Sequence, residues 1–80
     1  MSINTVIAKN LNRLRNERNL SLGQLAELSG VSKVMLSQIE KGDSNPTVNT
    51  IWKIASGLNV PYTAILEQPQ NETFIVSKTD

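Results

Sequence analysis

The sequence has no cysteine and no histidine among its 80 residues. Without cysteine the chain can form neither a disulfide framework nor a thiolate zinc site, and without histidine it lacks the commonest general base and metal ligand. The carboxylates are scattered, and the chain has neither a nucleophile in a recognisable motif nor a glycine-rich phosphate loop. We therefore expect a protein that is not an enzyme and that uses no metal or other cofactor.

Long apolar stretches are also missing. No apolar run reaches the roughly 18 residues that suggest a membrane span, and residues 1–9 lack the basic cluster and apolar block of a signal peptide. We expect a soluble, cytoplasmic protein with no membrane partner. Hydrophobic residues make up 39% of the chain and charged residues only 19%, which favours folding around one small core.

The net charge of +1 conceals an uneven distribution. Residues 1–66 carry seven basic and four acidic side chains, a net charge of +3, whereas residues 67–80 have a net charge of −2. We interpret residues 1–66 as the domain and residues 67–80 as a linker or tail, because the second segment opens with polar residues around a proline. A modestly basic domain is weak support for nucleic-acid binding.

The tail contains a short β-prone run at Phe74, Ile75 and Val76, which predicts a C-terminal strand. A single isolated strand is not stable in water. The run is therefore disordered, or pairs with a second subunit, or begins a further domain that this chain does not contain.

The domain segment shows helical periodicity. Ile3, Ile7, Leu11 and Leu14 recur at spacings of four, four and three residues, which predicts an amphipathic helix that ends near residues 18–19. Capping and stop residues predict four more helices: the second runs from Ser21 to Gly30, with Gln24 in its cap, and the third covers residues 33–41 after Ser32. The fourth follows Thr47 and turns Ile51, Ile54, Ala55 and Leu58 inward. The fifth covers residues 62–66 or 62–67, and Pro61 suits the first position at its start.

Two details concern packing. We expect the third helix to bury an apolar face made of Met35, Leu36 and Ile39. Gly57 falls inside the fourth predicted helix, where glycine costs about 1 kcal/mol relative to alanine. Its presence there indicates a close contact with another helix.

Residues 21–42, SLGQLAELSGVSKVMLSQIEKG, form two short capped helices joined by a tight turn that contains glycine. With LRNERNL before them and NPTVNTIWKIASGLNV after them, they resemble the phage-repressor and Cro-like helix-turn-helix family, also called the xenobiotic-response-element type, over residues 7–66. The resemblance implies an all-α, lambda-repressor-like bundle of five helices. The tail is similar to the point where longer relatives enter a cupin-type sensory domain, which implies an effector-binding domain absent from this chain.

The resemblance also implies a function. Members of this family place the third helix in the major groove of double-stranded DNA and act as two-fold dimers on inverted repeats. We expect a sequence-specific transcriptional regulator of bacterial or phage origin that is associated with the nucleoid. Of the two directions of regulation, we expect repression. The alternative is a protein-interaction module, antitoxin-like or coactivator-like, that uses the same fold as a scaffold.

The family mechanism assigns base reading to solvent-facing positions of the third helix, namely Lys33, Val34, Ser37 and Gln38. Gln38 suits adenine, Lys33 suits guanine, and Val34 suits a thymine methyl group. Phosphate contacts are expected from helix N-termini and the following loop, at Ser21, Gly23, Gln24, Ser32, Lys41, Asn45, Thr47 and Asn49. That loop carries Asp43 and no basic residue, whereas many relatives are basic there, so its phosphate anchoring should be weaker.

Two further features follow from the resemblance. Arg15 and Glu40 match a pair that forms an ion bridge between the first and third helices of relatives, which would fix the recognition helix against the scaffold. Apolar residues that the core does not need are candidates for the dimer contact: Trp52, Tyr62, Ile65, Phe74, Ile75 and Val76.

Overall fold

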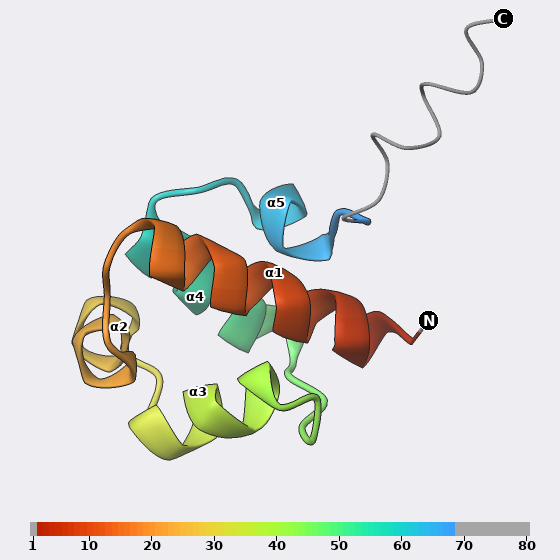
Figure 1. The fold of residues 1–80 in the computed structure, drawn as a ribbon, viewed down its shortest axis with the longest axis horizontal. Helices are drawn as coiled ribbons and strands as arrows, with labels where there is room; N and C mark the ends of the chain where they lie inside the picture. The colour runs from red at the N-terminus through yellow and green to blue at the C-terminus, as the bar shows by residue number, and fades with distance from the viewer. Residues whose placement is uncertain (1, 69–80) are drawn as a thin grey trace, which may run out of the picture.

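A computed structural model of the chain describes residues 2–68 (Figure 1). Its regular elements within this range are α1 (Ile3–Glu17), α2 (Leu22–Ser29), α3 (Lys33–Glu40), α4 (Val48–Leu58) and α5 (Tyr62–Leu66). The predicted all-α, five-helix fold is confirmed. The predicted strand at Phe74, Ile75 and Val76 lies outside the described residues. None of the helices in residues 2–68 is long and apolar enough to cross a membrane.

Local capping sets the helix boundaries. The first four helices begin at the hydroxyl residues Ser2, Ser21, Ser32 and Thr47, each of which accepts a hydrogen bond from the backbone N–H three residues on. At Ser21 the predicted capping box is complete, because the N–H of Ser21 also donates to Oε1 of Gln24 over 2.8 Å. Gly30 and Asn59 adopt left-handed backbone, with φ of 78° and 60°, and end α2 and α4 as predicted.

α1 and α3 end slightly earlier than predicted, at Glu17 and Glu40, whereas α5 covers the predicted residues 62–66 and only the place of Pro61 differs. α3 ends at Glu40 rather than Lys41, since Gly42 adopts a φ of 78° and turns the chain away after the last helical hydrogen bonds. Pro61 has an extended ψ of 151° and precedes α5 as its N-cap instead of forming its first residue. The fixed φ of proline suits either position, and the sequence alone does not distinguish them.

One hydrophobic core joins all five helices. Its buried members are Ile7, Leu11, Leu14, Leu25, Val31, Leu36, Ile39, Ile51, Ile54, Ala55, Leu58 and Ile65. Two expected core positions are wrong. Ile3 is half exposed because the first turn of α1 extends past its neighbours (Figure 1). Met35 is 37% exposed because Leu36 and Ile39 already fill the inward face of α3, and its sulfur instead accepts a hydrogen bond from the Ser44 hydroxyl.

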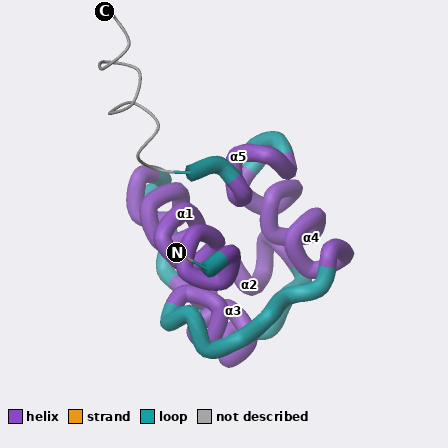
Figure 2. Tube along the Cα trace, turned by 90° about the vertical axis from the view of Figure 1, so that its right-hand side faces the viewer, coloured by secondary structure: helices purple, strands orange, loops and turns teal. Residues whose placement is uncertain are grey.

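The helices pack so that the two elements of the helix-turn-helix occupy one end of the molecule. α1 packs against α3 and α5, α4 packs against α2 and α5, and α2 packs against α3. In both backbone views α3 lies at the lower end and α5 at the upper end (Figures 1 and 2). No other described helix covers the outer face of α3, so this face is open to a partner.

The close contact predicted at Gly57 is present between α4 and α2. A Cβ atom on Gly57 would lie 3.0 Å from N, Cα and Cβ of Ser29, which is closer than ordinary van der Waals contact. Ser29 is itself buried, and its hydroxyl donates to the carbonyl of Leu25 and accepts from the N–H of Val31. The absence of a side chain at residue 57 therefore sets how closely the helix-turn-helix approaches its scaffold.

Two polar side chains, one in the middle of α1 and one just after it, hydrogen-bond to the C-terminal ends of α5 and α4. Asn10 has no exposed surface, and its Nδ2 donates to the carbonyls of Ile65 and Glu67, both over 2.7 Å. Nε of Arg18 donates to the carbonyl of Leu58, the last residue of α4, over 3.0 Å. Each bond satisfies a helix-end carbonyl that has no partner within its own helix.

Candidate nucleic-acid interface

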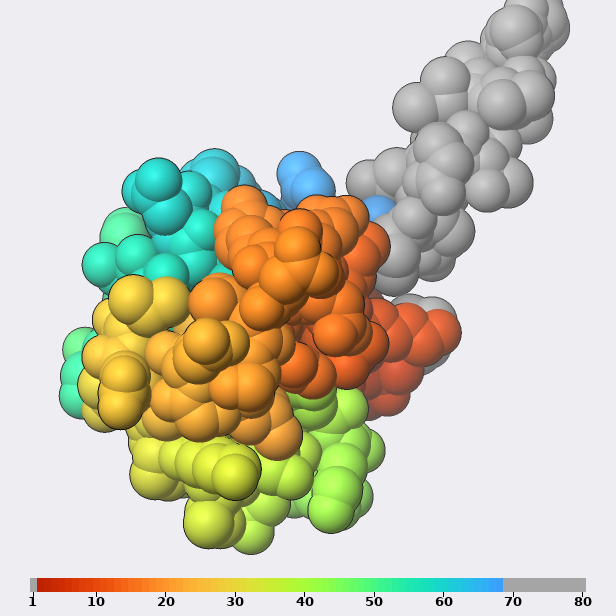
Figure 3. Space-filling view, turned by 60° about the vertical axis from the view of Figure 1, so that its left-hand side comes forward, coloured from red at the N-terminus to blue at the C-terminus, as the bar shows by residue number. Residues whose placement is uncertain are grey.

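The outer face of α3 and the start of α2 enclose a shallow surface hollow, which we call the reading hollow. It is lined by Leu22, Lys33, Val34, Ser37, Gln38 and Lys41. All four side chains predicted to read bases therefore lie together, with Lys41 beside them. In the space-filling view the residues of α3, coloured yellow to yellow-green, form the lower end of the molecule (Figure 3).

Helical periodicity explains why these side chains face outward. Leu36 has no exposed surface and Ile39 is 1% exposed, so both anchor α3 to the core. Val34, Ser37, Gln38 and Lys41, which are related by helical spacings of three or four residues, lie on the opposite side and face away from the core. Val34 is 68% exposed, the highest fraction among the exposed large hydrophobic side chains of residues 2–68.

Two lysines give the reading hollow positive charge. Lys33 and Lys41 both line it, and none of its lining residues is acidic. Within the part of the chain that the structure describes, no ion pair engages either lysine. Both cations are therefore available to a negatively charged partner.

The N-terminus of α2 keeps a hydrogen-bond donor at each residue predicted to bind phosphate, although its capping box uses other groups of two of them. The capping box occupies the N–H groups of Ser21 and Gln24 and the side-chain oxygens of both residues. The first N–H groups of a helix have no intrahelical partner, so the backbone amides of Leu22 and Gly23 remain for a phosphate, as does the hydroxyl proton of Ser21. Oε1 of Gln24 is used in the cap, but its Nε2 group remains to donate, so the phosphate contacts expected from Ser21, Gly23 and Gln24 stay predictions.

The remaining predicted phosphate contacts fall into two places. Ser32 lies at the start of α3, where its oxygen accepts from the N–H of Met35 and its hydroxyl proton is left to donate. The other predicted residues, Asn45, Thr47 and Asn49, are exposed on the loop before α4 and its first turn, and none of them lines the reading hollow. Thr47 additionally shares a hydrogen bond with the hydroxyl of Thr50.

An ion pair fixes the end of α3 against α1. Nε of Arg15 donates to Oε2 of Glu40 over 2.6 Å, and Nη2 of the same guanidinium donates to Oε1 over 3.0 Å. The remaining arm donates to the carbonyl of Leu20 over 2.7 Å, just before α2. Arg15 thus links α1 to the end of α3 and to the loop residue that precedes the N-cap of α2, and the side chains of the ion pair are only 14% and 10% exposed.

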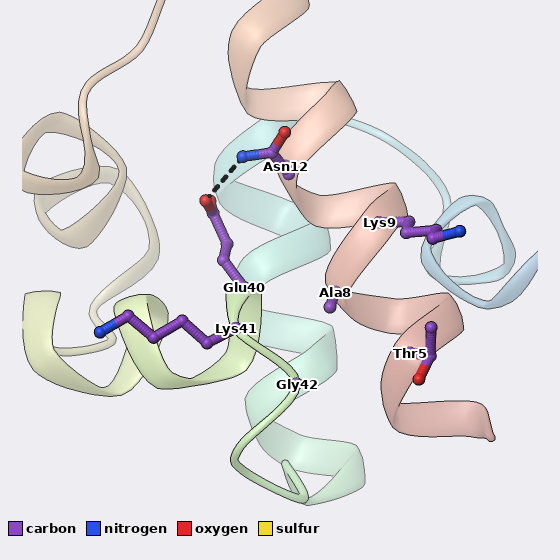
Figure 4. A pocket seen from close by; sticks show the side chains of 7 residues that line it. All are labelled: Thr5, Ala8, Lys9, Asn12, Glu40, Lys41 and Gly42. Carbon is purple, nitrogen blue, oxygen red and sulfur yellow. Dashed lines mark hydrogen bonds between the residues drawn. The ribbon is translucent and has the colours of Figure 1, made fainter.

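Sequence reasoning missed a third member of this network, Asn12. Its Nδ2 donates to Oε1 of Glu40 over 2.9 Å, and its own oxygen accepts from Asn16. Figure 4 shows Glu40 reaching from the end of α3 toward Asn12 on α1, across a small groove. Polar residues on the outer face of a predicted helix carry no signal of such a contact, whereas Asn10, which falls within the apolar stripe of α1, carries a weak one.

The network determines the ionisation of Glu40. Burial by itself would raise the pKa of the Glu40 carboxyl, but the hydrogen bonds from Arg15 and Asn12 and the nearby guanidinium charge lower it below its ordinary value. The hydrogen bond to Glu40 in turn raises the pKa of Arg15 above its ordinary value, against the opposing effect of burial. Both members of the pair are charged at neutral pH.

The predicted dimer residues separate into three groups. Trp52 and Tyr62 stack with ring centroids 4.9 Å apart, and Trp52 is 56% exposed. Ile65 has no exposed surface, so its assignment to a dimer contact is wrong: it belongs to the core beneath α5. The others, Phe74, Ile75 and Val76, lie outside the described residues.

Residues 2–68 contain no cluster of three acidic side chains close enough to hold a metal ion. In the reading hollow, the amide, hydroxyl, amine and apolar side chains of α2, α3 and Lys41 lie together. Such groups bind by hydrogen bonds, charge and contact, as nucleic-acid recognition requires.

Comparison with known proteins gives consistent matches. The profile of the Helix-turn-helix family HTH_3 matches residues 11–65. The HTH-type transcriptional regulator SutR of Escherichia coli (strain K12) is 52% identical over 67 residues, 84% of this chain and 38% of that protein. Control protein C.SmaI of Serratia marcescens is 35% identical over 66 residues, 82% of this chain and 79% of that protein.

A crystal structure of an HTH_3 family transcriptional regulator from Vibrio cholerae has a TM-score of 0.80 and 45% sequence identity, and it covers 95% of this chain and 42% of that one. The chain thus spans about two fifths of the length of the Escherichia and Vibrio proteins. The similarity concerns their helix-turn-helix parts.

Proposed function

The chain belongs to the Helix-turn-helix family HTH_3, and on that premise we propose that it is a transcriptional regulator that binds double-stranded DNA sequence-specifically. The observation that carries the proposal is the reading hollow, where four candidate base-reading side chains lie on the uncovered face of α3 beside two lysines without ion pairs. An enzyme or a purely structural bundle has no need to expose this combination.

In the proposed complex the N-terminal half of α3 enters the major groove and α2 crosses the DNA backbone. The amide of Gln38 pairs with N6 and N7 of adenine, and Lys33 donates to O6 and N7 of guanine. Lys41, Ser32 and the free amides of Leu22 and Gly23 bind phosphates. The ion pair between Arg15 and Glu40 holds α3 at a fixed angle while these contacts form.

We propose repression as the regulatory direction. A small domain seated in the major groove of a promoter excludes other proteins from the same site, so repression is the simplest outcome. HTH-type transcriptional repressor RghR of Bacillus subtilis (strain 168), 44% identical over 57 residues, carries that activity in its name. We place the activity in the cytoplasm of a bacterial cell, on the nucleoid.

A single α3 reads only a few base pairs, which is too little information for a unique site. We propose that two copies bind an inverted repeat whose half-sites lie about one helical turn apart. The exposed Trp52, stacked on Tyr62, supplies the contact between the copies. Large aromatic residues are the side chains most often responsible for such interfaces.

A selection of duplexes from a random pool tests the proposal. The chain should enrich one sequence family, bind it more tightly than a scrambled duplex, and lose affinity for both as salt concentration rises. The absence of salt-sensitive binding to any duplex, combined with a tight complex with another protein, would refute it and favour the protein-interaction module.

A further inference from the structure

Two apolar side chains stand among the hydrogen-bonding groups of the reading hollow. Val34 is the second residue of α3, and Leu22 is the first residue of α2. Val34 leaves 68% of its surface in water, although exposed apolar surface contributes nothing to the stability of the free protein. Leu22 is half-buried and packs partly on the core, so its exposed part is held in place.

We propose that Leu22 and Val34 together form a contact surface for the 5-methyl group of a pyrimidine in the major groove. The inference rests on the proposed function and specifies one element of its base preference. Among the base edges of that groove, only the 5-methyl group of thymine, or of a methylated cytosine, is apolar. Burial of this methyl group between two aliphatic side chains removes apolar surface of both partners from water.

The position of the pair suits this role. The N-terminal residues of a recognition helix approach the base edges closely, and Val34 lies in the first turn of α3. The side-chain caps at Ser21 and Ser32 fix the two helix starts that carry Leu22 and Val34. The contact surface is therefore ordered before DNA arrives.

The surroundings favour DNA over a protein as the occupant. The other lining residues, Lys33, Ser37, Gln38 and Lys41, are polar or basic, and no carboxylate is among them. The major groove combines methyl groups with hydrogen-bond acceptors and is flanked by phosphates, which matches this mixture. An apolar protein surface would leave two lysines unpaired.

The test replaces single methyl groups in the duplex that the chain selects. Each thymine is exchanged in turn for uracil, which differs only by the missing methyl group, and affinity is measured for each duplex. We expect a loss of about two- to fivefold at one or more positions in each half-site, the size that burial of one methyl group brings. A parallel series exchanges cytosine for 5-methylcytosine, so that a gain there without any uracil effect assigns the contact to methylated cytosine.

Protein variants locate the effect. Val34→Ala should remove most of the difference between the thymine and uracil duplexes, and Leu22→Ala should reduce it. Val48→Ala is the matched control, because Val48 is 60% exposed at the start of α4 and does not line the reading hollow. The ratio of two affinities measured on one protein sample does not depend on the folded fraction, so a destabilised variant still gives a valid result.

The outcomes are separable. Specific binding that is indifferent to the methyl group in both series, or a methyl effect that survives in Val34→Ala, overturns the inference and leaves the proposed function intact. Failure to bind any duplex specifically overturns both.

Discussion

Nε of Arg15 lies 2.6 Å from Oε2 of Glu40, and this contact joins the C-terminal half of α1 to the last residue of α3. The guanidinium also donates to the carbonyl of Leu20, so the same side chain holds the end of α3 and the loop that leads into α2. The pair is mostly buried, so the loss of either partner leaves a charge that water cannot fully solvate.

Glu40→Ala should therefore lower the free energy of unfolding by about 2–4 kcal/mol. Urea denaturation of the variant and the wild type measures the difference. Glu17→Ala is the matched control, since the pair of Glu17 with Arg13 is about half exposed and should contribute about 0–1 kcal/mol. Equal effects of the two variants would contradict a structural role for the pair with Arg15.

The lowered pKa of Glu40 predicts how stability depends on pH. A carboxyl with a lower pKa in the folded state than in the unfolded state stabilises the fold fully above its ordinary pKa, and this contribution is lost as pH falls through the folded-state value. Urea midpoints of the wild type and Glu40→Gln should differ by a constant amount at neutral pH and converge in acid. A difference that grows as pH falls would contradict this assignment.

Gly57→Ala should destabilise the protein by about 1–3 kcal/mol, because the new methyl group would lie 3.0 Å from the Ser29 backbone and must push α2 away from α4. Gly23→Ala is a matched control within α2, where the added Cβ would meet no atom closer than 3.9 Å. Alanine is the better helix former, so this second variant should be neutral or slightly more stable. Thermal unfolding of both variants tests the pair.

Gln38→Ala should weaken binding to the selected duplex by about tenfold or more and leave binding to a scrambled duplex nearly unchanged, because a bidentate contact to adenine is lost only at the correct site. Fluorescence anisotropy with both duplexes measures the two affinities. Equal losses on the two duplexes would assign Gln38 to phosphate contact and remove it from base reading.

Trp52→Ala should raise the dissociation constant of the proposed dimer by about tenfold or more, since a stacked aromatic pair would supply the centre of the interface. Sedimentation velocity over a range of concentrations measures the change. Leu28→Ala, which truncates a similarly exposed side chain on α2, should have no effect on dimerisation. A monomeric wild type at all concentrations would refute the dimer.

The sequence predicts most of the fold because its helix boundaries are local. Ser21 with Gln24, and the glycine at position 30, fix α2 through bonds that span only three or four residues. Gly57 gave a correct signal of close packing, since an unfavourable residue inside a helix needs a compensating reason. Short-range chemistry of this kind does not depend on the rest of the molecule.

Predictions that depend on distant contacts were less complete. The burial of Ile65 and the exposure of Met35 are decided by which neighbours α5 and α3 meet, which periodicity alone does not specify. The bond from Asn12 to Glu40 spans 28 residues and joins two polar side chains without any local signature. The grouping of Leu22 with Val34 likewise required the angle between α2 and α3.

The buried amide of Asn10 has a practical consequence for anyone who handles this protein. It ties the carbonyls of Ile65 and Glu67 to the middle of α1, on the side of the molecule away from α3 (Figure 1). The described residues end there, at residue 68, with the body of the domain between that point and the proposed DNA (Figure 1). A fluorophore attached at residue 68 itself should therefore leave the α3 face open to DNA.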